Sequence, residues 1–301
     1  MHTSEDPIPS ALPALGNDLE GRTVVITGGT NGVGAALALT LRDRGADVVI
    51  IGRSADKARE LIRRSDAQAT RGRMTSLVSD LSLMRSVHAT VDELADEIDH
   101  IDILVHAVGV FLSRVEHTAE GVELDFATSY LARFVFTERA AKQSLFGPTT
   151  RILSLAATAQ STPRLARVDF SDISALTRLT GLRSHAAAQT ANDLFMAAAP
   201  ARYGVAAMGY GPGNVRTGIL RDLPLWLSAL IRLFPRREPD AVAEQLAQLI
   251  ADERWSIQET GWANARGRIA IAPFMADPER QRALLYASEI LRERALGAIV
   301  A

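Results

Sequence analysis

From Gly21 onward, short apolar runs rich in β-branched residues alternate with longer stretches of helical periodicity. The short runs predict strands at 23–27, 47–51, 74–78, 102–106, 151–155, 205–210 and 268–271. Helical patterns lie between them near 33–43, 55–64, 83–98, 120–144, 185–202 and 239–252, with a closing one near 278–293. Continuous apolar runs such as 48–51 are typical of strands that are covered on both faces. The alternation therefore predicts an α/β, doubly wound domain with about seven parallel strands and helices on both faces of the sheet.

The domain organisation follows from the same pattern. No internal repeat and no linker interrupts the chain after residue 21, so we expect a single domain over 21–301. Residues 1–20 contain three prolines and lack the basic-then-apolar order of a signal peptide, which predicts a flexible lead-in. The longest membrane-like stretch, 223–234, is about half a bilayer span. We therefore expect a cytoplasmic protein without a membrane partner.

Charge and composition exclude several further classes of partner. The net charge of −2 gives no electrostatic reason to expect a nucleic acid. The chain has no cysteine, which excludes disulfides, thiolate nucleophiles and Cys-ligated metals. None of its six histidines has the spacing of a metal site, so no metal is expected.

A glycine-rich segment joins the first predicted strand to the first predicted helix, with the sequence Thr27-Gly28-Gly29-Thr30-Asn31-Gly32-Val33-Gly34. Glycines allow a tight turn there and let backbone N–H groups approach a pyrophosphate at the helix N-terminus. Because a strand precedes this segment and a helix follows it, the motif predicts a dinucleotide site on a Rossmann fold. Its candidate binding residues are Gly28, Thr30, Asn31, Gly32, Val33 and Gly34.

Arg53 favours one dinucleotide over the other. Sites for NAD place an Asp or Glu about 20 residues beyond the glycine loop, where the carboxylate binds the ribose 2′-hydroxyl. Here Gly52-Arg53-Ser54 occupies that position, with Arg53 located 19 residues past Gly34. A guanidinium binds a 2′-phosphate, whereas a carboxylate repels it. The predicted cofactor is NADP(H).

The spacing Thr-Gly-x-x-x-Gly-x-Gly resembles that of the short-chain dehydrogenase/reductase family, and further motifs extend the resemblance over about 21–293. The segments 120–134, 151–159 and 191–195 are similar to the retinol-dehydrogenase-like branch. Asp80-Leu81 matches the step that contacts adenine in the family, and the Pro-Gly-x-Val-x-Thr segment at 212–217 matches the one that holds the nicotinamide end. The resemblance adds Asp80, Leu81, Gly109, Pro212, Gly213 and Thr217 to the candidate cofactor-binding residues.

The resemblance fails at the catalytic positions, which in the family carry Asn, Ser, Tyr and Lys. Aligned residue by residue, these positions fall on Ser129, Ala157, His185 and Gln189. Shifting the alignment does not restore the pair. The four tyrosines, at 130, 203, 210 and 286, are followed four residues later by Phe134, Ala207, Asn214 and Ile290. The chain therefore contains no Tyr-x-x-x-Lys.

The replacement residues define the candidate catalytic set. His185 and Gln189 are four residues apart and share one face of a helix. A histidine can donate or accept a proton near neutral pH, and a glutamine can bind a ribose hydroxyl but cannot lower the pKa of a neighbour. Ser129 is a third candidate. His106, at the end of a predicted strand, is either a structural group or a functional one.

Three functions remain open from the sequence. The first is an NADP(H)-binding oxidoreductase with an atypical active site. The second is a non-redox cyclase, dehydratase or isomerase of natural-product biosynthesis, and the third is a non-catalytic nucleotide-binding subunit. A predicted lid over 218–240, with Trp226 among leucines, suggests either a small apolar substrate or plain packing. The small apolar residues of the helices at 120–144 and 185–202 predict outer faces that pair in a homodimer or homotetramer.

Overall fold

The structure is a computed structural model. It describes residues 11–12, 15–16, 18–67, 71–112, 114–156, 168–176, 181–216, 236–252, 255–256 and 260–297.

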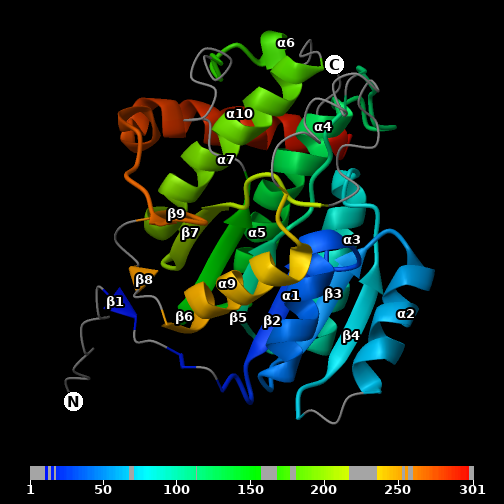
Figure 1. The fold of residues 1–301 in the computed structure, drawn as a ribbon. Coiled ribbons are helices and arrows are strands. Elements are labelled where there is room, and N and C mark those ends of the chain that lie inside the picture. Colours follow the sequence, from blue (N-terminus) through cyan, green and yellow to red (C-terminus); the bar gives the residue numbers. More distant parts are fainter. Residues whose placement is uncertain are drawn as a thin grey trace, which may run out of the picture.

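A twisted sheet forms the centre of the molecule and has eight strands among the described residues, in the order β10-β9-β7-β6-β5-β2-β3-β4 (Figure 1). All neighbouring pairs are parallel except β9 and β10. The strands are β2 (Thr23–Thr27), β3 (Asp47–Gly52), β4 (Met74–Val78), β5 (Ile101–His106), β6 (Phe146–Leu155), β7 (Ala206–Gly211), β9 (Gly261–Asn264) and β10 (Gly267–Arg268). The predicted doubly wound Rossmann fold is confirmed.

The last predicted strand is wrong in its position. The run at 268–271 was expected to complete the parallel sheet, but β9 does so, and β10 turns back antiparallel to it. The reason is a tertiary contact. Trp262 of β9 packs over Gly209 of β7, where an added Cβ would come within 2.5 Å of the indole Nε1. This packing selects a segment with few β-branched residues over the apolar run that follows it.

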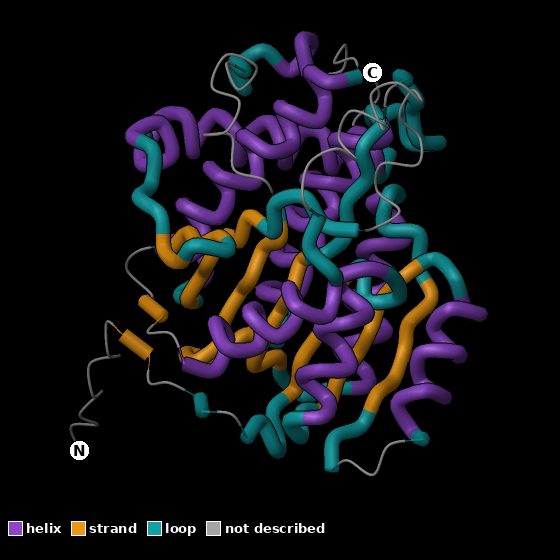
Figure 2. Tube along the Cα trace, in the orientation of Figure 1, coloured by secondary structure: helices purple, strands orange, loops and turns teal. Residues whose placement is uncertain are grey.

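Helices cover both faces of the sheet (Figures 1 and 2). One layer contains α1 (Gly32–Asp43), α2 (Ala55–Asp66) and α9 (Pro239–Asp252), and the other contains α3 (Met84–Glu97), α5 (Ala132–Lys142) and α7 (Leu182–Tyr203). Successive residues of β2 serve the two layers, since Val24 and Ile26 pack with Leu37 of α1, and Val25 packs on the opposite side. The other helical segments among the described residues are α4 (Leu124–Phe126), a π-helical turn (Ala127–Leu131), α6 (Ile173–Leu176), a 3₁₀ turn (Pro273–Ala276) and α10 (Pro278–Ala295).

The predicted pairing face of the helices at 120–144 and 185–202 is already covered within one chain. Helix α10 crosses over α7, and its Leu284 and Leu291 belong to the same buried cluster as the apolar residues of α5 and α7. The Tyr130 hydroxyl lies 2.6 Å from Ser288 Oγ of α10. Because these faces are buried, the predicted interface is wrong. A homodimer or homotetramer remains a prediction and would need another surface.

Parts of the segment before residue 21 contact the domain. Strand β1 (Ala11–Leu12) pairs antiparallel with β8 (Trp255–Ser256), and the amides of Leu15 and Gly16 both donate to the Ala251 carbonyl. Leu19 is fully buried. These described residues are therefore held against the domain, unlike the flexible lead-in that the prolines predict.

No helix within the described ranges has both the length and the apolar character needed to cross a membrane.

Candidate functional site

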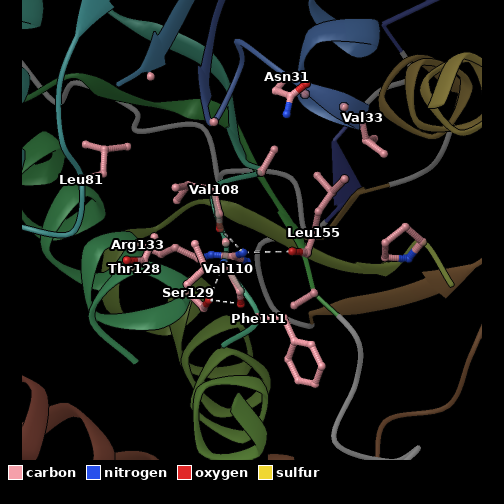
Figure 3. Close-up of a pocket in the computed structure, with 18 of the residues that line it drawn as sticks. Asn31, Val33, Leu81, Val108, Val110, Phe111, Thr128, Ser129, Arg133 and Leu155 are labelled. Carbon is pink, nitrogen blue, oxygen red and sulfur yellow. Dashed lines mark hydrogen bonds between the residues drawn. The ribbon is translucent and has the colours of Figure 1, made fainter. Parts of the chain in front are cut away.

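A pocket of about 590 Å³ opens at the carboxyl ends of the central strands. Strands β2 and β5 are neighbours there, but the chain leaves β2 toward β3 and leaves β5 toward β6, so this edge is the point where ligands bind in doubly wound folds. Figure 3 shows Asn31 and Val33 at one end of the pocket, and Val110, Phe111, Ser129 and Arg133 at the other. We refer to the end with Asn31 and Val33, where the sequence predicts a dinucleotide, as the nucleotide end, and to the end with Ser129 and Arg133 as the reaction end.

The glycine loop forms the first end, and all six of its candidate residues line the pocket. Gly28 has φ +78°, and an added Cβ would lie 2.6 Å from the Val108 backbone nitrogen, so the loop touches the end of β5. Asn31 precedes α1 in an extended conformation, and its side chain makes no capping hydrogen bond. The first-turn amides of α1 have no intrahelical acceptors, which leaves them for an anionic group such as a pyrophosphate.

Arg53 and Asp80 flank this end. Both line the pocket, together with the buried Leu81. Arg53 is exposed and makes no hydrogen bond or ion pair with any other described residue. Asp80 makes local hydrogen bonds within its own turn, because its Oδ1 accepts from the Ser82 amide at 3.1 Å and from the Ser82 hydroxyl at 2.8 Å. Arg53 is thus an exposed cation that directly follows β3 and lines the pocket.

Ser129 lies in the π-helical turn, at the other end of the pocket. The sequence pattern predicts an unbroken helix over 120–144, but the helix starts at Leu124 and carries this π turn, a feature frequent at functional sites. The Ser129 hydroxyl accepts from the Val110 amide at 3.1 Å and donates to the Val110 carbonyl at 3.2 Å. Asn192 Nδ2 donates to the Ser129 carbonyl at 2.8 Å. Ser129 therefore fixes the loop after β5, with its hydroxyl occupied.

His185 and Gln189 both face the pocket from α7, as their shared helical face predicts. The His185 Nδ1 lies 3.1 and 3.2 Å from the two carboxylate oxygens of Asp125, which is fully buried. A carboxylate only accepts, so Nδ1 carries a proton, and the Gln189 amide nitrogen donates to Nε2 across 3.3 Å. Phe111 packs edge-on against the imidazole at 4.4 Å between ring centroids. The imidazole is therefore oriented from both sides.

The sequence pattern did not identify Asp125 as a site residue. It sits one helical turn before Ser129, and its contact with His185 spans 60 residues of sequence. The available signal was an acid between apolar neighbours, Leu124 and Phe126, at the start of a predicted core helix. A carboxylate in such a position needs a partner when it is buried.

The sequence pattern did not identify Arg133 as a site residue either. Arg133 lies at the reaction end of the pocket, beside Ser129 and Val110 (Figure 3). It extends from α5, is 3% exposed, and donates to Ser154 Oγ at 2.7 Å, to the Val108 carbonyl at 2.6 Å and to the Leu155 carbonyl at 3.0 Å. Burial lowers the pKa of its guanidinium to about 9. An arginine inside an apolar run was the available sequence signal.

His106 is structural. It is fully buried, with Nδ1 3.3 Å from the Thr27 hydroxyl and Nε2 3.0 Å from the Thr137 hydroxyl. Burial, followed by the charge of Arg133, holds the pKa of His106 well below its usual range, so the ring is neutral. It does not line the pocket.

Three further candidate cofactor-binding residues, Gly109, Pro212 and Gly213, also line the pocket. Thr217, Ala157 and the 217–235 part of the predicted lid, with Trp226, lie outside the described residues.

Comparison with known proteins decides the family. Residues 22–169 match the profile described as short chain dehydrogenase. A putative daunorubicin C-13 ketoreductase from Streptomyces is 31% identical over 207 residues, which is 67% of this chain and 69% of that protein. The chain belongs to the short-chain dehydrogenase/reductase family. Within it, the chain is similar to the retinol-dehydrogenase-like branch, since human retinol dehydrogenase 11 is 25% identical over 83% of this chain and 81% of its own length.

Two further matches cover different extents. The WW domain-containing oxidoreductase of Drosophila melanogaster is 35% identical over half of this chain, and the matched segment spans only 37% of that protein. A solved short chain dehydrogenase from Burkholderia cenocepacia in complex with NADP superposes with a TM-score of 0.59 at 23% identity, over 78% of this chain and 92% of that one. At this identity the superposition shows a shared fold.

Proposed function

We propose that the protein is an NADP(H)-dependent oxidoreductase in which His185, oriented by Asp125, transfers the proton that accompanies the hydride. The observation that carries the proposal is a single pocket lined by the glycine loop and Arg53 at one end and by His185 at the other. Membership of a dehydrogenase/reductase family and an NADP-bound structure with the same fold support it.

The pocket residues fit the dinucleotide in both charge and shape. The free guanidinium of Arg53 suits a 2′-phosphate, and the close approach at Gly28 leaves the uncapped N-terminus of α1 for the pyrophosphate. Gln189 Oε1 is buried and has no hydrogen-bond partner among the described residues. A ribose hydroxyl at this end would satisfy it, which is the task we assign to Gln189.

When bound, NADPH would supply a hydride, and the chain's own residues would hold and transfer the proton. Reduction of a carbonyl adds the hydride to carbon and a proton to oxygen. Because Asp125 occupies Nδ1, the proton would be exchanged at His185 Nε2, where the substrate oxygen would replace the 3.3 Å contact with the Gln189 amide. The buried carboxylate, 3.1 Å from Nδ1, stabilises the positive charge that the ring carries when it holds both protons. In the opposite direction, the neutral ring accepts the proton at the same atom.

The substrate that suits this end is a small apolar carbonyl compound or alcohol. Phe111 packs against His185, and Val110 and Leu155 also line the pocket, so that this pocket offers apolar contacts. A cytoplasmic location, which the sequence predicts, suits such chemistry.

A two-step experiment tests the function. NADPH fluorescence titration measures binding, and a panel of aldehydes, cyclic ketones and quinones is then incubated with enzyme and NADPH. Product formed in a one-to-one ratio with oxidised NADPH supports the proposal. Conversion without NADPH oxidation would replace it with a non-redox enzyme, and binding without any conversion would favour a nucleotide-binding subunit.

Arg53→Ala should lower the affinity for NADPH roughly 10- to 100-fold and leave the affinity for NADH unchanged. A hydrogen bond to a charged group contributes about 1.5–3 kcal/mol, and only NADPH has the 2′-phosphate that would receive it. Fluorescence titration of both nucleotides measures the change. Arg59→Ala is the matched control, because Arg59 pairs with Asp56 on α2 away from the pocket. Equal affinities of the wild-type protein for NADPH and NADH would contradict the assignment of Arg53.

A further inference from the structure

Arg133 places an unbalanced positive charge inside the pocket. All of its hydrogen bonds go to neutral acceptors, namely the Ser154 hydroxyl and the carbonyls of Val108 and Leu155. Within the described part of the chain, no carboxylate forms an ion pair with it, and its Nε has no partner at all. Burial is the only influence that shifts its pKa, and at about 9 that pKa still leaves the group charged at pH 7.

Two acids, one in the pocket lining and one behind His185, have partners other than Arg133. Asp125 pairs with His185, and Asp80 accepts from Ser82 at the nucleotide end. Charges that are not compensated in a buried site act strongly on their surroundings, because protein screens them far less than water does. A cation that lies in the wall of a binding pocket therefore discriminates between ligands that differ in charge.

The position of Arg133 decides which part of a dinucleotide it would act on. A Cβ added at Gly109 would lie 3.6 Å from Arg133 Nη2 and 3.6 Å from Ser129 Oγ, so the guanidinium lies directly under the loop after β5. This is the end of the pocket opposite to Asn31 and Val33 (Figure 3). With the phosphates at the glycine loop and Arg53, the nicotinamide half is directed to the Arg133 end.

The two redox states of that ring differ by one positive charge, since the oxidised nicotinamide is a cation and the reduced one is neutral. We propose that the charge of Arg133 makes the pocket select NADPH over NADP⁺, which adapts the enzyme to reduction. The inference rests on the proposed function, because it requires that a nicotinamide dinucleotide binds in this pocket. It also requires a direct charge effect, beyond the hydrogen bonds with which Arg133 ties β5 to β6.

Dissociation constants measured by equilibrium dialysis at low salt test the inference without any turnover. For the wild-type protein, we expect NADPH to bind at least about tenfold more tightly than NADP⁺, which corresponds to about 1.4 kcal/mol. In Arg133→Gln, which removes the charge and keeps hydrogen-bonding capacity, this ratio should fall to within about threefold, through tighter binding of NADP⁺. Arg133→Lys keeps the charge and should keep the ratio.

Arg139→Gln removes a charge from the same helix outside the pocket, where Arg139 pairs with Asp92, and should leave the ratio unchanged. If Arg133→Gln does not fold, the inference can still be tested on the wild-type protein. Its dissociation constants for NADPH and NADP⁺ are compared with that for 2′-phospho-ADP-ribose, which lacks the nicotinamide ring. NADP⁺ should bind more weakly than this fragment, and NADPH should not. An equal affinity for NADPH and NADP⁺ in the wild type, or an unchanged ratio in Arg133→Gln, overturns the inference. Failure of all three nucleotides to bind would instead refute the proposed function.

Discussion

His185→Ala should slow the NADPH-dependent turnover of a carbonyl substrate at least about 10²-fold and leave NADPH affinity within a few-fold. A positioned general acid contributes typically about 10²- to 10⁴-fold to the rate. Among the described residues that line the pocket, His185 is the only histidine, and it is paired with a buried carboxylate. The phosphate and adenine contacts lie at the opposite end of the pocket, so binding should be nearly unaffected. Single-turnover oxidation of NADPH and fluorescence titration measure the two quantities separately.

Asp125→Asn should reproduce most of this loss through His185, without removing any atom that touches the substrate. An asparagine amide would donate to Nδ1, and the proton of the neutral ring would then move to Nε2, which is the wrong tautomer for accepting a substrate proton. We expect kcat for alcohol oxidation to fall on the order of 10²-fold, with KM within a few-fold. The ¹⁵N chemical shifts of the imidazole report the tautomer directly, and they should change from the Nδ1-protonated to the Nε2-protonated pattern.

Asp193→Asn provides the matched control for this effect. Asp193 is also a buried acid that faces an aromatic donor, since Trp262 Nε1 donates to it across 3.2 Å, but it lies outside the pocket. The substitution should affect stability and leave the His185 tautomer unchanged. Full turnover in His185→Ala would show that the imidazole only packs against Phe111. An unchanged tautomer in Asp125→Asn would show that Gln189, rather than Asp125, orients the ring.

The residues that the sequence assigned to the dinucleotide line one end of the pocket, and a pattern could bring them together because that end depends on local structure. The glycine loop, its strand and its helix are contiguous in sequence, and Arg53 follows the next strand directly. Positive φ at Gly28 and the extended Asn31 are properties of single residues in a known context. Such features are encoded within a few residues, so that a pattern is enough to find them.

The reaction end was predicted only in part because it depends on packing between distant elements. The sequence indicated that His185 and Gln189 share a helical face, but the contact of His185 with Asp125 exists only because α4 packs against α7. The role of Arg133 depends in the same way on the loop after β5 and on the end of β6, which supply the acceptors Val108 and Leu155. Side-chain partners across a fold leave no periodic signal along the chain.

The predicted pairing face of α7 was also wrong because packing between distant elements decides which faces are exposed. The small residues of this helix were interpreted as an exposed pairing surface, yet small residues are needed equally where a helix packs closely within its own chain. Helix α10, more than 70 residues later, supplies that packing through residues such as Leu284. Composition describes what a helix face can pack against and does not show which element occupies it.

Gly28→Ala should abolish dinucleotide binding and lower the free energy of unfolding by about 2–5 kcal/mol. Gly28 has φ +78°, which disfavours any residue with a Cβ. The added Cβ would also lie 2.6 Å from the Val108 nitrogen and 2.7 Å from its Cα, and backbone atoms cannot rotate away as a side chain does. The ends of β2 and β5 must then separate, and this separation displaces the loop that holds Ser129 and Arg133.

Gly121→Ala separates the two causes, because Gly121 has nearly the same φ, +79°, and nothing lies within 4 Å of an added Cβ. Its cost should be only the conformational part, about 1–2 kcal/mol, with NADPH binding unchanged. Urea unfolding gives the free energies, and fluorescence titration gives the affinities. If both variants lose the same stability and both bind NADPH, the contact of the glycine loop with Val108 tolerates a methyl group. The inference that the junction between β2 and β5 is rigid, and that the geometry of the pocket depends on it, would then be wrong.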